Sequence, residues 1–230
     1  MTKKATFIIV LSAIITNHSF AQKSFSIDNA STTYNAKIEV KKCDNETCSG
    51  KGKVKLYSKN DAKLLQEFNS ADLYFNLDKN KNPSTKMELY DEESPLVFGD
   101  FNFDGQEDLA IRNGNKSGYG GPSYDVYVYQ LAGQHFVLSK DLTKLASTNL
   151  GMFDVDKKRK RIITRSKSGA AWHLKTEYEV IPQKGLLKVY ELEEDASKGD
   201  EYVYVTEKKF ANGKWSKSTK KHKLKDYYKE

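Results

Sequence analysis

The chain has 230 residues, with 38 Lys and Arg against 31 Asp and Glu, which gives a formal net charge of +7. Its mean hydropathy of -0.71 excludes a protein built from several membrane-spanning helices. The length suits one all-β domain that buries a core of its own. The 14 Tyr and 11 Phe add aromatic side chains of the kind that strands favour.

The first 21 residues have the pattern of a secretory signal peptide. Lys3 and Lys4 precede a short apolar run at residues 7–15, and Ser19-Phe20-Ala21 matches a small-x-small cleavage pattern. The apolar run is too short to span a bilayer, and no Cys follows it for a lipid anchor. We therefore expect an exported protein, periplasmic or secreted, with no membrane anchor and one domain over residues 22–230.

The only two cysteines are Cys43 and Cys48, in the run Cys-Asp-Asn-Glu-Thr-Cys. Export would place them in an oxidising compartment, where a polar turn between two cysteines favours a disulfide at a hairpin tip. A zinc or redox site is the alternative, but no second Cys pair or nearby His completes one.

Alternation of polar and apolar residues with a period of two predicts strands along most of the chain. The expected strands are residues 37–41, 53–57, 73–77, 125–131, 135–139, 161–164, 172–180, 186–192, 201–207 and 208–215. Residues 61–68 fit either two helical turns or a strand, and residues 142–146 fit one helical turn. Asn212-Gly213 predicts a tight hairpin turn. This spacing of strands and turns is typical of a sandwich, a barrel or a propeller.

The densest basic cluster is residues 157–161, with the sequence Lys-Lys-Arg-Lys-Arg. Such a cluster can bind nucleic acid. It follows one short strand pattern and precedes another, however, so we interpret it as the solvated tip of a hairpin. We expect no nucleic-acid partner.

The sharpest chemical motif lies in residues 100–108, which have the pattern D-x-N-x-D-G-x-x-D. Calcium takes roughly six to eight oxygen ligands, and side-chain oxygens at alternate positions converge when such a loop curls around an ion. Gly105 permits the sharp turn because glycine tolerates a positive φ. The predicted ligands of a structural Ca²⁺ are Asp100, Asn102, Asp104, the carbonyl of Gln106, and Asp108.

An EF-hand does not fit this loop, because Ile111 stands at the twelfth position, where an EF-hand has a bidentate Glu. The flanking residues 94–98 and 109–112 also predict strands rather than helices. Loops of this β-flanked type occur in the calcium-binding blades of integrin-like propellers. We expect Phe101 and Phe103 to anchor the loop in the core. An Asp-rich turn without metal is the alternative.

A glycine-rich loop follows, with four glycines between Gly114 and Gly121 and Tyr119 among them. An aromatic side chain on an exposed loop is a natural anchor in a partner's cleft. Tyr119 could equally fold back onto the sheet, and the residues alone leave both readings open.

Residues 99–129, GDFNFDGQEDLAIRNGNKSGYGGPSYDVYVY, resemble a family of periplasmic β-propeller-like proteins of xanthomonads. Members of that family act as immunity proteins against lysozyme-like peptidoglycan hydrolases that a type IV secretion system delivers. The stretch is also similar to bacterial inhibitors of invertebrate-type lysozyme, and a looser likeness extends to Val180. The resemblance implies an all-β, β-propeller-like single domain of antiparallel sheets that binds Ca²⁺ and inserts a loop into the hydrolase's active site. That inhibitory loop maps to Ser117, Gly118, Tyr119 and Tyr124, with Tyr119 as the plug.

Two other functions are alternatives to inhibition. A calcium-dependent adhesion or glycan-binding module would use exposed tyrosines on its sheets. An enzyme ranks last, because no G-x-S-x-G elbow is present and His173 lies in a strand pattern, where a packed histidine is more common than a general base.

Overall fold

The computed structural model describes residues 23–28, 30–44, 46–83, 85, 94–182 and 184–228. The predicted signal peptide lies outside these residues. The described chain forms three antiparallel sheets, whose strand orders are β1-β2-β3-β4, β5-β6-β7-β8 and β14-β13-β12-β11-β10-β9. The all-β class is therefore confirmed.

The first sheet contains β1 (Lys23–Ile27), β2 (Tyr34–Asp44), β3 (Thr47–Ser58) and β4 (Leu64–Asn76). The middle sheet contains β5 (Leu96–Gly99), β6 (Asp108–Arg112), β7 (Tyr124–Gln130) and β8 (His135–Leu138). The third sheet contains β9 (Asp154–Asp156), β10 (Arg161–Ser168), β11 (Trp172–Ile181), β12 (Gly185–Asp195), β13 (Tyr202–Ala211) and β14 (Lys214–Lys223). The helical elements are η1 (Gly118–Gly120), α1 (Lys140–Thr148) and α2 (Leu224–Tyr227).

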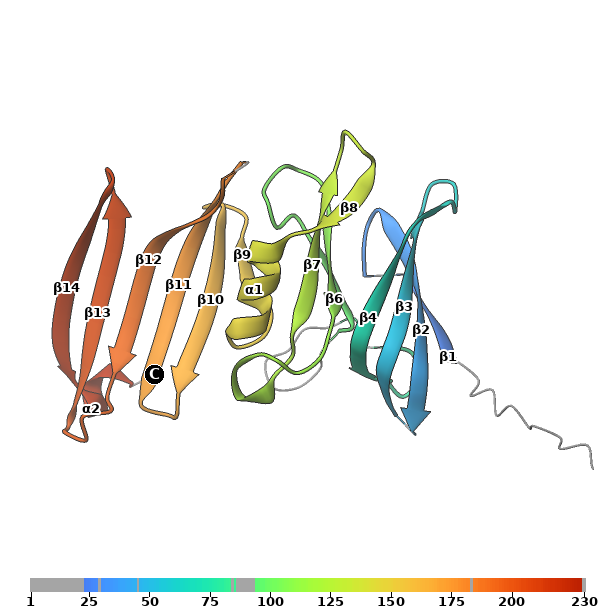
Figure 1. Ribbon diagram of the computed structural model, residues 1–230. Coiled ribbons are helices and arrows are strands. Elements are labelled where there is room, and N and C mark those ends of the chain that lie inside the picture. Colours follow the sequence, from blue (N-terminus) through green and yellow to red (C-terminus); the bar gives the residue numbers. More distant parts are fainter. Residues whose placement is uncertain are drawn as a thin grey trace, which may run out of the picture.

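The three sheets follow one another in a row, with α1 between the middle and the third sheet (Figure 1). Each sheet joins strands that are consecutive in the chain, so each is an antiparallel meander, the topology of a propeller blade. The sheets are open, however, and the described residues form no closed ring of blades. The described residues thus share the meander topology of propeller blades but do not show a propeller arrangement.

Two hydrophobic cores lie on opposite faces of the middle sheet. On β6, Leu109 and Ile111 join the core beside the first sheet, whereas Ala110 between them joins the core beside α1 and the third sheet. This is the period-two alternation of a strand with both faces covered. All five residues of β6 are buried, so this strand is a rigid platform for the loops at its two ends.

Several sequence predictions are confirmed. Cys43 and Cys48 form a disulfide and lie directly opposite each other on β2 and β3. The run 157–161 covers the turn between β9 and β10 and the first residue of β10, as expected for a hairpin tip. Asn212-Gly213 makes the turn between β13 and β14.

Other boundaries differ from the prediction. Residues 201–207 and 208–215 were expected as separate strands, but β13 continues from Tyr202 to Ala211. Strand β14 extends to Lys223, which the pattern did not predict because nearly all of its side chains are exposed and few are apolar. The predicted helical turn at 142–146 is the centre of the longer α1, which Ser139 caps by accepting a bond from the Leu142 amide at 3.4 Å. Residues 64–68 belong to strand β4, not to a helix.

None of the helices in the described ranges is long and apolar enough to cross a membrane.

Candidate functional site: two loops at the ends of β6

The predicted calcium loop ends where β6 begins, and the segment that carries the predicted inhibitory loop follows the end of β6. Asp108 is the first residue of β6 and Arg112 is the last, and both are buried. One short strand therefore positions both candidate sites. The two loops are nevertheless held by different kinds of interaction.

Asp108 closes the first loop from inside the protein. One carboxylate oxygen accepts hydrogen bonds from the amides of Phe101 at 2.7 Å and Asn102 at 3.3 Å. The other oxygen accepts a bond from the Tyr129 amide on β7 at 2.9 Å. The side chain thus joins the start of the loop to the neighbouring strand, and this bracing role was not predicted from the sequence.

The other side chains of the calcium motif curl over the outer part of the loop. Asp100 Oδ1 and Asn102 Oδ1 both accept a bond from the Asp104 amide at 3.1 Å, so two expected ligand oxygens lie beside the same N–H. Asp100 Oδ2 accepts from the Gly105 amide at 3.0 Å, and Asp104 Oδ1 accepts from the Gln106 amide at 2.8 Å. Gly105 has a φ of 86°, as the sequence predicts.

The negative charge of this loop has no basic partner within the described residues. Asp100, Asp104 and Asp108 make no ion pair there with Lys or Arg. Burial raises the pKa of Asp108 to about 7, bonds from the Tyr129 and Phe101 amides oppose that rise, and the charges of Asp104 and Asp100 add to it. A bound cation would relieve this repulsion.

The donor set fits a calcium ion in its chemistry. Carboxylate, amide and carbonyl oxygens are the ligands that calcium prefers. Within the described ranges, no three His, Cys, Asp or Glu side chains converge as a metal site, so the loop would depend on Asn102 and on the Gln106 carbonyl as well as on its acidic groups. The five residues that would hold the ion are those the sequence predicts. Calcium binding itself stays a prediction.

Two phenylalanines and one hydrogen bond that the sequence did not predict attach this loop to the rest of the fold. Phe101 is buried and packs edge-on against Phe153, with ring centroids 5.4 Å apart, and Phe103 is partly buried against the same core. The expectation that both anchor the loop is therefore confirmed. Glu107 accepts a bond from the buried Ser31 hydroxyl at 2.6 Å, which ties the loop to the segment before β2.

The second loop is held by backbone hydrogen bonds to distant parts of the chain. The Gly114 amide donates to the Asp72 carbonyl at 2.7 Å, and the Gly118 amide donates to the Asn149 carbonyl at 2.7 Å. A Cβ atom at Gly118 would lie 3.3 Å from that Asn149 oxygen, so the close approach favours glycine. These contacts hold the loop on the β4 side and on the α1 side.

Tyr119 is the most prominent side chain of this loop. Its residue is 66% exposed and adopts a left-handed backbone with φ 59°. The hydroxyl accepts a hydrogen bond from the Gly169 amide at the β10–β11 turn, and the Lys167 ammonium lies 5.0 Å from the ring centroid. The ring is therefore exposed and also held at its tip, which combines the two readings that the sequence left open.

The other predicted residues of the inhibitory loop lie differently. Gly118 is half-buried, while Ser117 is 6% exposed and Tyr124 is 1% exposed. The Tyr124 hydroxyl donates to the Ser94 carbonyl at 3.0 Å. Ser117 and Tyr124 thus support the loop from inside and offer no surface to a partner in this conformation.

A cleft of about 300 Å³ lies beside the first loop. Asn102 and Asp104 line it from the first loop, Asp141 and Leu142 line it from α1, and residues 180–182, 185 and 186 line it from around the β11–β12 turn; Val128 and Ser139 complete the lining. Its lining is mostly apolar, and Asp104 and Asp141 contribute the carboxylates.

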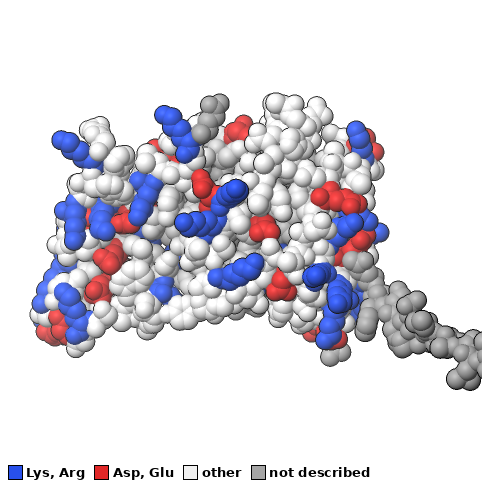
Figure 2. Space-filling model, in the orientation of Figure 1, with Lys and Arg blue, Asp and Glu red and all other residues white. Residues whose placement is uncertain are grey.

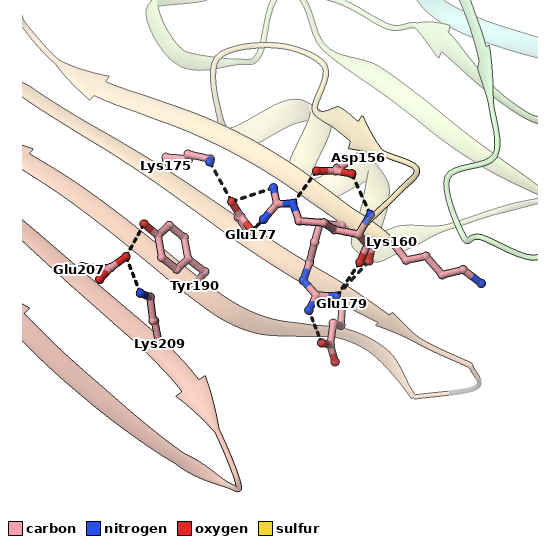
Figure 3. A network of polar contacts seen from close by, with 10 residues as sticks. Asp156, Lys160, Lys175, Glu177, Glu179, Tyr190, Glu207 and Lys209 are labelled. Atoms are coloured by element: carbon pink, nitrogen blue, oxygen red, sulfur yellow. Dashed lines mark hydrogen bonds and ion pairs between the residues drawn. The ribbon is translucent and has the colours of Figure 1, made fainter.

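A separate polar network covers the outer face of the third sheet (Figure 3). Glu177 is buried and accepts from Arg159 Nη1 at 2.7 Å and pairs with Lys175 Nζ at 2.8 Å. Arg159 also donates to Asp156 at 2.6 Å. Burial raises the pKa of Glu177, but the bonds from Arg159 and Lys175 outweigh it, and the pKa lies below its ordinary value. Glu177, Arg159, Asp156 and Lys175 all have partners in this network, so we interpret it as structural.

Comparisons with known proteins bear on the fold. No protein family and no curated protein matches the sequence. A solved structure, described as that of a Xanthomonas type IV secretion system related protein, is similar with a TM-score of 0.64 and 19% identity. The match covers 85% of this chain and 92% of that chain. At this identity the likeness establishes a shared fold over most of both chains.

Proposed function

We propose that the protein is an exported inhibitor of a peptidoglycan-degrading, lysozyme-like hydrolase, which it blocks with the loop that carries Tyr119. The observation that carries this proposal is the pose of Tyr119. The residue is 66% exposed, while the loop around it is fixed by backbone bonds to Asp72 and Asn149. An exposed aromatic on a fixed loop is the geometry of a plug.

A fixed loop favours binding because little conformational freedom is lost when the complex forms. Tyrosine is frequent among residues that dominate interface energies, since it buries a large ring and keeps a polar tip. Such a plug would occupy the sugar subsites of the hydrolase and shield its catalytic carboxyl groups. The inhibitor needs no chemistry of its own for this.

Calcium is a structural part of the proposal. Asp100, Asn102, Asp104, the Gln106 carbonyl and Asp108 would hold it, and the ion would supply the positive charge that the loop lacks. Because β6 connects this loop to the Tyr119 loop, a cation here stiffens the platform of the plug. The abundant calcium outside the cytoplasm permits a weak site, with Kd of roughly 10⁻⁴ to 10⁻³ M.

The role as a periplasmic immunity protein is supported by two further points. The stretch 99–129 resembles the family of immunity proteins described above, and the similar solved structure is related to a type IV secretion system. The three meander sheets are compatible with the β-propeller-like arrangement of that family. Hydrolase-bearing competitors would make such an inhibitor useful to its host.

The test measures clearing of a cell-wall suspension by a panel of lysozyme-like hydrolases, with and without the purified mature protein. We expect the wild type to slow one of them and Tyr119→Ala to raise the inhibition constant at least about 30-fold, as for a residue that dominates an interface. Tyr228→Ala is the matched control, because Tyr228 is also exposed, at 51%, but lies at the end of α2. Equal inhibition by the Tyr119 variant would contradict the proposal. Saturable glycan binding without inhibition would favour the adhesion alternative.

A further inference from the structure

The hairpin of β13 and β14 is the end of the third sheet farthest from the middle sheet in the row (Figure 1). Among the described strands, β14 pairs only with β13, and no described strand pairs with its other edge. Nine of its ten residues are exposed, and the remaining one, His222, is half-buried. Within the described residues, both faces of this strand are open over nearly all of its length.

This strand carries an unusual excess of positive charge. From Tyr202 to Lys223 there are seven lysines and a single acidic residue, Glu207. The two lysines of β13 are paired, Lys208 with Glu191 at 2.9 Å and Lys209 with Glu207 at 2.9 Å. The lysines of β14 form no ion pair with any described residue; they are Lys214, Lys217, Lys220, Lys221 and Lys223. Figure 2 shows lysine and arginine side chains grouped along this end of the molecule.

An aromatic pair accompanies the lysines at the hairpin turn, made of the exposed Trp215 and the half-buried Phe210. Trp215 is 45% exposed, and its ring lies 5.4 Å from that of Phe210 across the two strands. Of the two turn residues, Asn212 is polar and Gly213 has no side chain. Lys214 and Lys217 flank Trp215 along β14. The tip therefore presents one amphipathic ring among unpaired cations.

We propose that the β13–β14 hairpin is a peripheral binding surface for an anionic phospholipid membrane. Free ammonium groups are attracted to lipid phosphates, and each basic side chain adds to that attraction close to the surface. Tryptophan favours the interfacial region, where its ring is apolar and its N–H is hydrated. Neither feature alone is enough, since one aromatic side chain gives little depth and lysines alone give no insertion. This inference does not depend on the hydrolase proposal.

Lysines on an edge strand have a second established use, which is to discourage pairing with another sheet. Protection of the edge requires no exposed Trp, and it predicts a different result when the β14 lysines are replaced. Without guarding lysines the edge strand would associate with a second copy, while vesicle binding would be unaffected. The two explanations are thus separable in one set of variants.

The experiment measures co-sedimentation of the mature protein with phosphatidylglycerol vesicles and with phosphatidylcholine vesicles at about 0.1 M salt, where the Debye length is about 10 Å. We expect binding to the anionic vesicles only. The triple variant Lys214→Gln, Lys217→Gln, Lys220→Gln should bind at least about 10-fold more weakly, given the contribution of each Lys near a charged surface. Trp215→Ser should weaken binding about 3-fold or more and should abolish the fluorescence blue shift that vesicles cause in the wild type.

The matched control removes the same charge from another exposed tip, with Lys157→Gln, Lys158→Gln and Lys160→Gln on the β9–β10 turn. It should change binding by less than about 2-fold, because the potential of the bilayer is screened within about 10 Å. An equal loss in both triple variants would mean attraction by net charge alone and would overturn the proposal. Absence of wild-type binding to anionic vesicles, or unchanged binding by the β14 triple variant with increased self-association, would overturn it as well.

Discussion

The two loops that flank β6 differ in what holds them. In the loop at residues 100–108, side-chain oxygens accept the backbone bonds, and none of its three aspartates forms an ion pair with a described Lys or Arg. In the loop after β6, backbone groups of other elements hold the chain, through Asp72 and Asn149. The first loop therefore depends on charge and on any cation that binds it. The second depends mainly on packing of the fold.

This contrast changes the expected role of calcium. The proposed function gives the ion the role of stiffening the platform that carries Tyr119. The contacts indicate instead that Tyr119 keeps its pose through the β4, α1 and β10–β11 contacts, and that a cation acts on it indirectly through β6. Loss of the ion should loosen the first loop far more than the second.

The largest expected effect separates Tyr119 of the second loop from Tyr124 at the start of β7, because the two differ in burial. Tyr124→Ala should lower the free energy of unfolding by about 3 to 5 kcal/mol, since it removes a fully buried ring. Tyr119→Ala should change it by less than about 0.5 kcal/mol, because that ring is mostly exposed. Urea unfolding measures both. Similar losses in the two variants would contradict the placement of these side chains.

The next effect tests the brace of the first loop. Asp108→Asn should lower the free energy of unfolding by about 2 to 3 kcal/mol in EDTA. The amide NH₂ of the new side chain would face backbone donors and leave one buried N–H without an acceptor. Asp28→Asn, at an exposed position, is the control and should change stability by less than about 0.5 kcal/mol. Equal values for the two variants in urea unfolding would show that the Asp108 bonds contribute little.

Calcium itself should have a smaller effect. At a free concentration ten times its Kd, an ion that binds only the native state stabilises it by about 1.4 kcal/mol. Thermal unfolding should show a higher Tm in calcium than in EDTA, and Asp104→Ala should remove this difference while Tyr119→Ala retains it. A calcium response that survives in Asp104→Ala would place the ion elsewhere.

The smallest effect comes from a region remote from both loops. Because the pKa of Glu177 is lowered from 4.5, its contribution to stability is present above about pH 4.5 and is lost as the pH falls through the folded-state value. Arg159→Gln should lower the free energy of unfolding only slightly at pH 7, because Arg159 is half-exposed, and by less at pH values below about 4, where Glu177 becomes protonated. Its calcium response should equal that of the wild type. If this variant lost more stability as the pH fell, the predicted pH dependence of the Arg159–Glu177 pair would be wrong.

The local features of the sequence predicted much of this fold. Period-two patterns located most strands, and the polar turn between Cys43 and Cys48 predicted the disulfide. The fully exposed β14 lacks an apolar alternation, so its length was not predictable from pattern.

The candidate site was predictable in part. The spacing of Asp100 to Asp108 and the glycines around Tyr119 marked the two loops. The partners of those loops are backbone groups of Asp72, Tyr129, Asn149 and Gly169, which any residue type supplies and which only the tertiary fold brings close. The arrangement of the sheets in a row also depends on packing between distant segments, which no local pattern specifies.

The most direct test of the central claim is native-state amide hydrogen exchange, residue by residue, in calcium and in EDTA. We predict that EDTA speeds exchange of the Gly105 and Gln106 amides by at least about 10-fold, while the Gly114 and Gly118 amides, bonded to Asp72 and Asn149, change by less than about 3-fold. Equal acceleration in both loops, or no change in the first, would contradict the account.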